Sequence, residues 1–144
     1  MIILPEIILS VGFLILLSMS PFIKTYSFRK IGYLSLFLIF ITQFFIVKDI
    51  FIFEEVFNGF FIIDSFGSFL KLIILISAGL IIFFYLIVKN EESLKRPEFP
   101  LVVLLSLIGM LLMVSANNLL SLFVSIELQS LGLYVLVSFS KEDL

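Results

Sequence analysis

Residues 117–139 read NNLLSLFVSIELQSLGLYVLVSF, an apolar stretch that carries one carboxylate, Glu127, close to its middle. A stretch of this length can cross the hydrocarbon core of a bilayer as an α-helix. A charged side chain at the centre of such a helix costs about 2.5–3.5 kcal/mol on insertion scales, so intramembrane carboxylates are rare and usually functional. The stretch therefore predicts a membrane helix whose Glu127 lies on an ion or proton path.

Small and polar side chains recur along this stretch at spacings of three and four residues, which places them on one helix face. They are Asn118, Ser121, Ser125, Gln129 and Gly132. Glu127 is turned to the opposite side, where Ser130 and Tyr134 follow it at i+3 and i+7. We expect a helix inside a bundle, with its small face packed closely on a neighbour and its Glu127 face lining a more polar space.

The composition excludes an ordinary soluble globule. The chain is 62% hydrophobic and 14% charged, with a mean hydropathy of +1.30, whereas soluble domains are about half apolar and about a quarter charged. It has no Cys and no His, so we expect no haem, iron–sulfur or zinc site and no redox cofactor in this chain. A net charge of −2 offers no basic surface for nucleic acid. The composition indicates an integral membrane protein in contact with lipids.

Apolar runs predict an all-α bundle of five transmembrane helices, at 2–20, 31–47, 66–88, 101–114 and 117–139. Pro5 and Glu6 fit the first turn of the first helix. Lys71 lies inside the third run, where we expect its side chain to snorkel to the interface, with Asp64 as a partner. Before the fifth helix, Ser115 or Asn117 is the expected N-cap.

The loop 48–64 has a different pattern from the runs around it. Its Asn58-Gly59 dipeptide is flanked by the aromatic and β-branched segments FIF and FFII. Asn-Gly between such segments favours a β-hairpin. We expect a short hairpin on the membrane surface rather than a further crossing.

Basic residues predict the orientation. With five spans, all the basic residues of the loops except Lys48 fall on one side of the membrane. They are Lys24, Arg29, Lys30, Lys89, Lys95, Arg96 and Lys141. The positive-inside rule then places the N-terminus outside and the C-terminus in the cytoplasm or matrix.

Three motifs resemble one known family. The run 112–139, LMVSANNLLSLFVSIELQSLGLYVLVSF, strongly resembles the fourth and fifth helices of subunit 2 of respiratory complex I, which is called subunit N in bacteria. Leu4-Pro5-Glu6-Ile7-Ile8 resembles the start of the first helix of that family. Asp64-Ser65-Phe66 with Phe69-Leu70-Lys71 is similar to the entry into the third helix.

The resemblance implies an antiporter-like, proton-translocating membrane subunit of NADH:ubiquinone oxidoreductase. Glu127 occupies the place of a glutamate that pairs in that family with a lysine on a broken seventh helix. It further implies that residues 1–144 form a single membrane domain. Residues 1–98 would hold three N-terminal helices and an external loop at 48–64. The first two helices of the antiporter-like repeat would then lie in 99–144. Flavin and iron–sulfur clusters are expected elsewhere in the complex, with no redox chemistry in this chain.

The chain is shorter than the family's subunits and lacks the partner lysine. A split subunit is expected, in which a second chain carries the remaining helices, beside the other membrane subunits of complex I. The expected location is the mitochondrial inner membrane, or alternatively a bacterial plasma membrane. Two other functions remain open: a fragment of a multisubunit sodium/proton antiporter, and a non-transporting structural subunit in which Glu127 only fixes helix packing.

Overall fold

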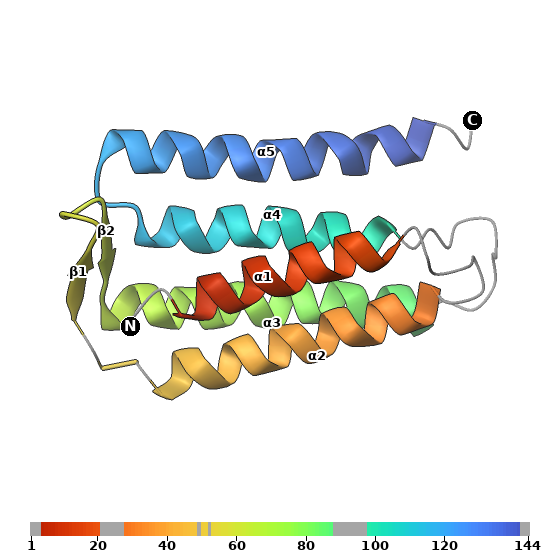
Figure 1. Ribbon diagram of the computed structural model, residues 1–144, viewed down its shortest axis with the longest axis horizontal. Helices are drawn as coiled ribbons and strands as arrows, with labels where there is room; N and C mark the ends of the chain where they lie inside the picture. The colour runs from red at the N-terminus through yellow and green to blue at the C-terminus, as the bar shows by residue number, and fades with distance from the viewer. Residues whose placement is uncertain (1–3, 21–27, 49, 52, 88–97, 142–144) are drawn as a thin grey trace.

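The computed structural model describes residues 4–20, 28–48, 50–51, 53–87 and 98–141, and within them it forms a bundle of helices with one small β-hairpin at its end (Figure 1). The elements in chain order are α1 Leu4–Met19, α2 Phe28–Lys48, β1 Glu54–Val56, β2 Phe61–Ile63, α3 Ser65–Ile87, α4 Glu98–Ser115 and α5 Leu119–Lys141. The predicted all-α membrane bundle is confirmed, and each predicted helix has its counterpart.

The lengths of the helices support four spans directly. Within the described residues, α2, α3, α4 and α5 contain segments long and apolar enough to cross a membrane. The apolar helix α1 has only 16 described residues, which extend for about 24 Å at 1.5 Å per residue, against a hydrocarbon core of about 30 Å. Of the five predicted spans, the described residues therefore support four, and the described part of α1 is shorter than a span needs.

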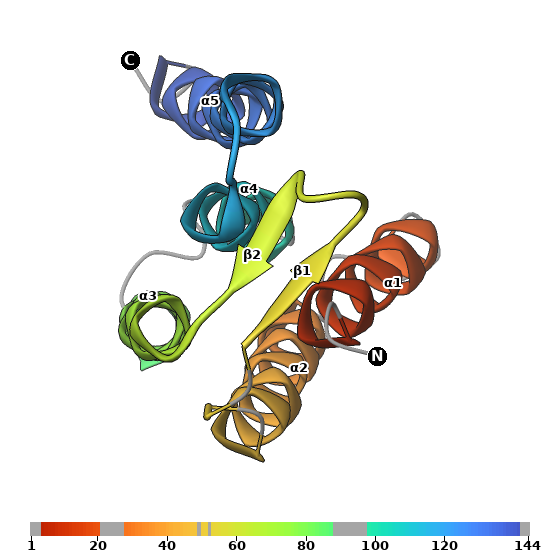
Figure 2. The same ribbon diagram turned by 90° about the vertical axis from the view of Figure 1, so that its left-hand side faces the viewer.

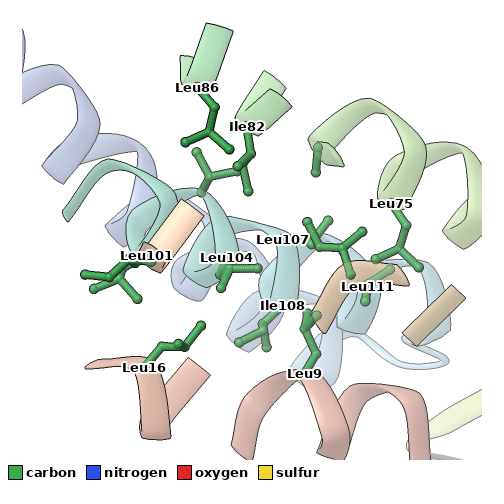
Figure 3. Packing of buried hydrophobic residues seen from close by; sticks show 14 of the residues in the cluster. Leu9, Leu16, Leu75, Ile82, Leu86, Leu101, Leu104, Leu107, Ile108 and Leu111 are labelled. Atoms are coloured by element: carbon green, nitrogen blue, oxygen red, sulfur yellow. The ribbon is translucent and has the colours of Figure 1, made fainter. Parts of the chain in front are cut away.

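The core is built around α4. Its side chains are apolar on all sides, which suits a helix buried on all sides. Leu104, Leu107 and Leu111 of α4 are fully buried or nearly so and pack against leucines and isoleucines of α1 and α3 (Figure 3). Figure 2 shows α1, α2, α3 and α4 around a common centre, with α1 and α3 at opposite corners, while α5 lies beyond α4 at the edge of the bundle.

The predicted hairpin in the loop 48–64 is confirmed. Strands β1 and β2 pair antiparallel, with Glu54 opposite Ile63 and Val56 opposite Phe61. The turn between them has three successive residues with positive φ, namely Phe57 at 54°, Asn58 at 54° and Gly59 at 82°. Left-handed backbone is natural for Gly and tolerated by Asn, which explains why this dipeptide marks the turn.

The hairpin crosses the end of the bundle and is bonded to the connection between α4 and α5 (Figure 2). Phe61 forms a β-bridge with Ala116. The Asn117 amide N–H donates to the Phe60 carbonyl at 3.0 Å, and Asn117 Nδ2 donates to the Gly59 carbonyl at 2.7 Å. The hairpin is thus attached to the helical bundle, in addition to any contact it makes with the membrane surface.

The N-cap of α5 is Asn118, which corrects the expectation of Ser115 or Asn117. Asn118 Oδ1 accepts from the Ser121 amide at 2.8 Å, and the Asn118 amide donates back to Ser121 Oγ at 3.3 Å. Asn117 is instead bonded to the hairpin, and Ser115 is buried at the end of α4. All three residues are good cap formers, so their order along the chain alone could not select one.

Asn118→Ala is expected to destabilise the bundle by about 1 kcal/mol, because it leaves an amide of the first turn of α5 without an acceptor. Thermal unfolding in detergent measures the effect, with Asn118→Ser as the control that retains a side-chain acceptor. Equal loss in both variants would show that the cap is not the source of the stability.

Candidate functional site: the α5 face and a buried ion pair

The small face of α5 lies directly on α4. Ser121 and Ser125 are buried, and Gly132 is buried as well. A Cβ at Gly132 would lie 2.9 Å from Ser106 Cβ and 3.0 Å from Ser106 N, so the two helices approach almost to main-chain contact. Small residues permit this approach, as is usual where membrane helices pack.

The other two members of that face are Asn118, at its beginning, and Gln129, between Ser125 and Gly132. Gln129 is partly buried, with its backbone against Gly109 of α4, and Asn118 is exposed as the N-cap. Ser125 Oγ donates to the Ser121 carbonyl of its own helix at 2.7 Å. Ser125 thus contributes small size at the interface, since its hydrogen bond stays within α5.

Glu127 lies on the side of α5 opposite Ser125 and Gly132, which face α4, and its side chain is exposed in this chain. Tyr134 on the same face is 69% exposed, and the partly exposed Ser130 donates its hydroxyl to the Ile126 carbonyl at 2.8 Å. Within the described part of the chain, no Lys or Arg forms an ion pair with Glu127. The expectation of a helix inside the bundle is therefore not met by these residues alone, because only one side of α5 is covered.

A buried ion pair is the principal feature that the sequence analysis missed. Lys71 Nζ of α3 donates to Glu6 Oε1 of α1, and both side chains are only 4% exposed. The two helices occupy opposite corners in Figure 2, so the pair spans the centre of the four-helix arrangement. The expected snorkelling of Lys71 to the interface is wrong, because its ammonium group is held inside the bundle.

Asp64 does not partner Lys71 either. Its Oδ1 accepts from the Gly67 amide at 2.8 Å, and its carbonyl accepts from the Ser68 amide at 2.9 Å. Asp64 is thus the N-cap of α3, a role that satisfies the free amides of the first turn. One signal could have revealed the true pair: α1 and α3 run in the same direction, and each carries one charge of opposite sign near its beginning.

Metal ligands do not gather in the described residues, where no three of the His, Cys, Asp and Glu side chains form a cluster that could hold an ion.

The fold and these two ionisable centres define the class: an α-helical integral membrane protein with a carboxylate on a membrane helix and a charge pair inside its bundle. The comparisons point to a particular relative. NADH-quinone oxidoreductase subunit N of Parvibaculum lavamentivorans is 39% identical over 140 residues, which are 97% of this chain. The same subunit of Bartonella bacilliformis is 35% identical and that of Rhodospirillum rubrum 36% identical, each over 98% of this chain.

The chain is thus related to NADH-quinone oxidoreductase subunit N, and the resemblance drawn from its motifs is confirmed. It spans 29% of the length of each of these three curated relatives, which fits the interpretation that it corresponds to the N-terminal part. No family model matches the chain. The apolar helices support a membrane location. The named relatives are bacterial, so they do not indicate a mitochondrial one.

Proposed function

We propose that this chain supplies the first five helices of an antiporter-like, proton-translocating subunit of NADH:quinone oxidoreductase. The similarity to subunit N supports the assignment to that complex. The observation that carries the transport role is the position of Glu127, inside the apolar helix α5 and on its uncovered face. A carboxylate retained at such a position is functional by default.

On this proposal, Glu127 meets a lysine carried by helices beyond these 144 residues. A cation close to the carboxylate favours its ionised form, and withdrawal of that cation favours proton uptake. A movement of the lysine toward and away from Glu127 would therefore drive proton release and uptake. Residues 99–144 would form the first two helices of the transporting repeat, and 1–98 would form the three helices that precede it. Electron transfer through flavin and iron–sulfur clusters would take place in other subunits.

Glu127→Gln is expected to leave the complex assembled and NADH oxidation measurable, while fewer protons are translocated per NADH. The glutamine has nearly the same size as glutamate but cannot release a proton. The measurement is proton uptake by membrane vesicles during NADH oxidation. Leu131→Ala, one turn further along the same exposed face, is the matched control and should translocate normally. Normal translocation combined with poor assembly in Glu127→Gln would instead support a purely structural carboxylate.

Isolation of the particle that contains this chain tests the assignment to the complex. We expect flavin, iron–sulfur clusters and the other membrane subunits of complex I in the same particle. A particle that lacks them and exchanges sodium for protons would identify the multisubunit antiporter instead. The intact mass of the subunit in that particle also tests whether a second chain carries the remaining helices. Fractionation of membranes would distinguish the mitochondrial inner membrane from a bacterial plasma membrane.

A further inference from the structure

The Glu6–Lys71 pair is incompletely satisfied. Lys71 Nζ is bonded to one carboxylate oxygen, Oε1, whereas Glu6 Oε2 is buried and receives no hydrogen bond from the described residues. Ser115 Oγ, at the end of α4, is the other buried side-chain atom without a partner among the residues that the structure describes. Buried polar atoms nearly always have partners, so each exception needs an explanation.

The three polar residues belong to one layer of the bundle. Leu9, Leu75 and Leu111 are fully buried and come from α1, α3 and α4 (Figure 3). One turn nearer the hairpin, the same three helices present Glu6, Lys71 and Ser115 respectively, since residues three or four apart share a helix face. Helices α1 and α3 begin, and α4 ends, at the end of the bundle where the hairpin lies (Figure 1). The ion pair therefore lies between the apolar core on one side and the hairpin end on the other.

A pair that served only to hold helices together would be expected to use both carboxylate oxygens. Desolvation of two charges is recovered only when the remaining lone pairs are also bonded. Glu6 keeps one carboxylate oxygen, Oε2, available to a proton. This arrangement suits a site that exchanges a proton better than it suits a structural clamp.

We propose that Glu6 and Lys71 form a second proton-exchanging site of this chain, separate from Glu127 and located near the hairpin end. A hydronium ion gives its proton to Glu6 Oε2: an O–H bond forms on the carboxyl group, and a neutral water molecule is left. The ion pair with Lys71 opens as the carboxyl group becomes neutral, and Lys71 keeps its own positive charge. Release reverses both changes. On this proposal, the buried hydroxyl of Ser115, which shares the layer, takes part by hydrogen bonding to the carboxyl group during the exchange.

We expect protons to reach Glu6 from the hairpin end of the bundle. In the opposite direction the layer of Leu9, Leu75 and Leu111 offers no polar atom to a proton. Other charged groups of the described residues near the hairpin end are few and are occupied or exposed. They are the α3 cap Asp64, the exposed Glu54 and Glu55, and Lys48, whose ammonium lies over the Phe44 ring. None of them forms an ion pair with Glu6 or Lys71.

The inference rests on the proposed function for its physiological setting, and its test uses the assembled complex in membrane vesicles. The Glu6→Gln/Lys71→Met double variant removes both charges, so it avoids leaving one buried ion alone. We expect it to assemble and oxidise NADH, with a loss of proton translocation. Infrared difference spectra on acidification should show a protonated-carboxyl band in the wild type that the double variant lacks. Assembly with full translocation and an unchanged band would overturn the inference.

Ser115→Ala provides a second test if the double variant fails to assemble. It should assemble and translocate fewer protons, and unchanged translocation would count against the site. Ser106→Ala is its matched control, because Ser106 is also buried on α4 but donates to carbonyls of its own helix. A normal result for Ser115→Ala together with a loss in Glu127→Gln would refute this site and leave the proposed function intact. The reverse pair of results would support the site and refute the role proposed for Glu127.

Discussion

Lys71→Met is expected to destabilise the bundle by about 3–5 kcal/mol, because it leaves the Glu6 carboxylate buried without a counter-ion. Both side chains are 4% exposed, so water cannot replace the lost ammonium group without rearrangement of the helices. The variant should accumulate at a lower level and unfold at a lower temperature in detergent. Both quantities can be compared directly with the wild type.

The double variant Glu6→Gln/Lys71→Met is the decisive comparison for this effect. Replacing both partners of a buried ion pair by apolar residues of similar volume is often neutral or stabilising, whereas removing one partner is strongly destabilising. The double variant should therefore recover part of the stability that Lys71→Met loses, because both charges are gone but the glutamine amide stays polar. The losses in unfolding free energy of the single variants Glu6→Gln and Lys71→Met could instead add up in the double variant. Glu6 and Lys71 would then make independent contributions, and the pair would not be the source of the effect.

Gly109→Val is expected to separate α4 from α5. A Cβ at this position would lie 2.6 Å from the backbone nitrogen of Gln129 and 2.9 Å from its Cα. Main-chain atoms cannot move aside as a side chain can, so the helices must shift. Overpacking of a well-packed interface typically costs about 1–3 kcal/mol, and valine brings two methyl groups beyond the Cβ.

Thiol labelling measures this separation. The chain has no Cys, so Ser125→Cys introduces a single reporter at a position that is 1% exposed on the α5 side of the interface. The reporter should stay protected in the parent and become reactive when Gly109→Val is added. Gly79→Ala on α3 is the control, because the nearest atom to its Cβ would be Ile39 Cγ2 at 3.9 Å, an ordinary contact. Protection retained in Gly109→Val would contradict the close approach.

The features that could be predicted from the sequence are those governed by local patterns. Helices follow from long apolar runs, and the hairpin follows from Asn58-Gly59, whose residues adopt positive φ. The contact between the small face of α5 and α4 follows from spacing, because Gly132 and Ser125 lie on one side of any α-helix. These patterns need no knowledge of which helices are neighbours.

The buried pair and the cap depended on information that is not local. Lys71 and Glu6 are far apart in the sequence and belong to helices at opposite corners, so only the packing of all four helices brings them together. The cap of α5 was misplaced because the hairpin bonds Asn117, which leaves Asn118 to receive the Ser121 amide. Exposure of Glu127 likewise depends on which helices cover α5.

The bonds between Asn117 and the hairpin have a consequence for the depth of Glu127. Hydrogen bonds to Phe60 and Gly59 fix the position of Asn117, two residues before α5, at the hairpin end of the bundle. A slide of one residue in that connection would break both bonds, turn the glutamate by about 100° around the helix axis and move it by about 1.5 Å along it. The hairpin between α2 and α3 thus fixes the position of the Glu127 carboxylate along and around the axis of α5.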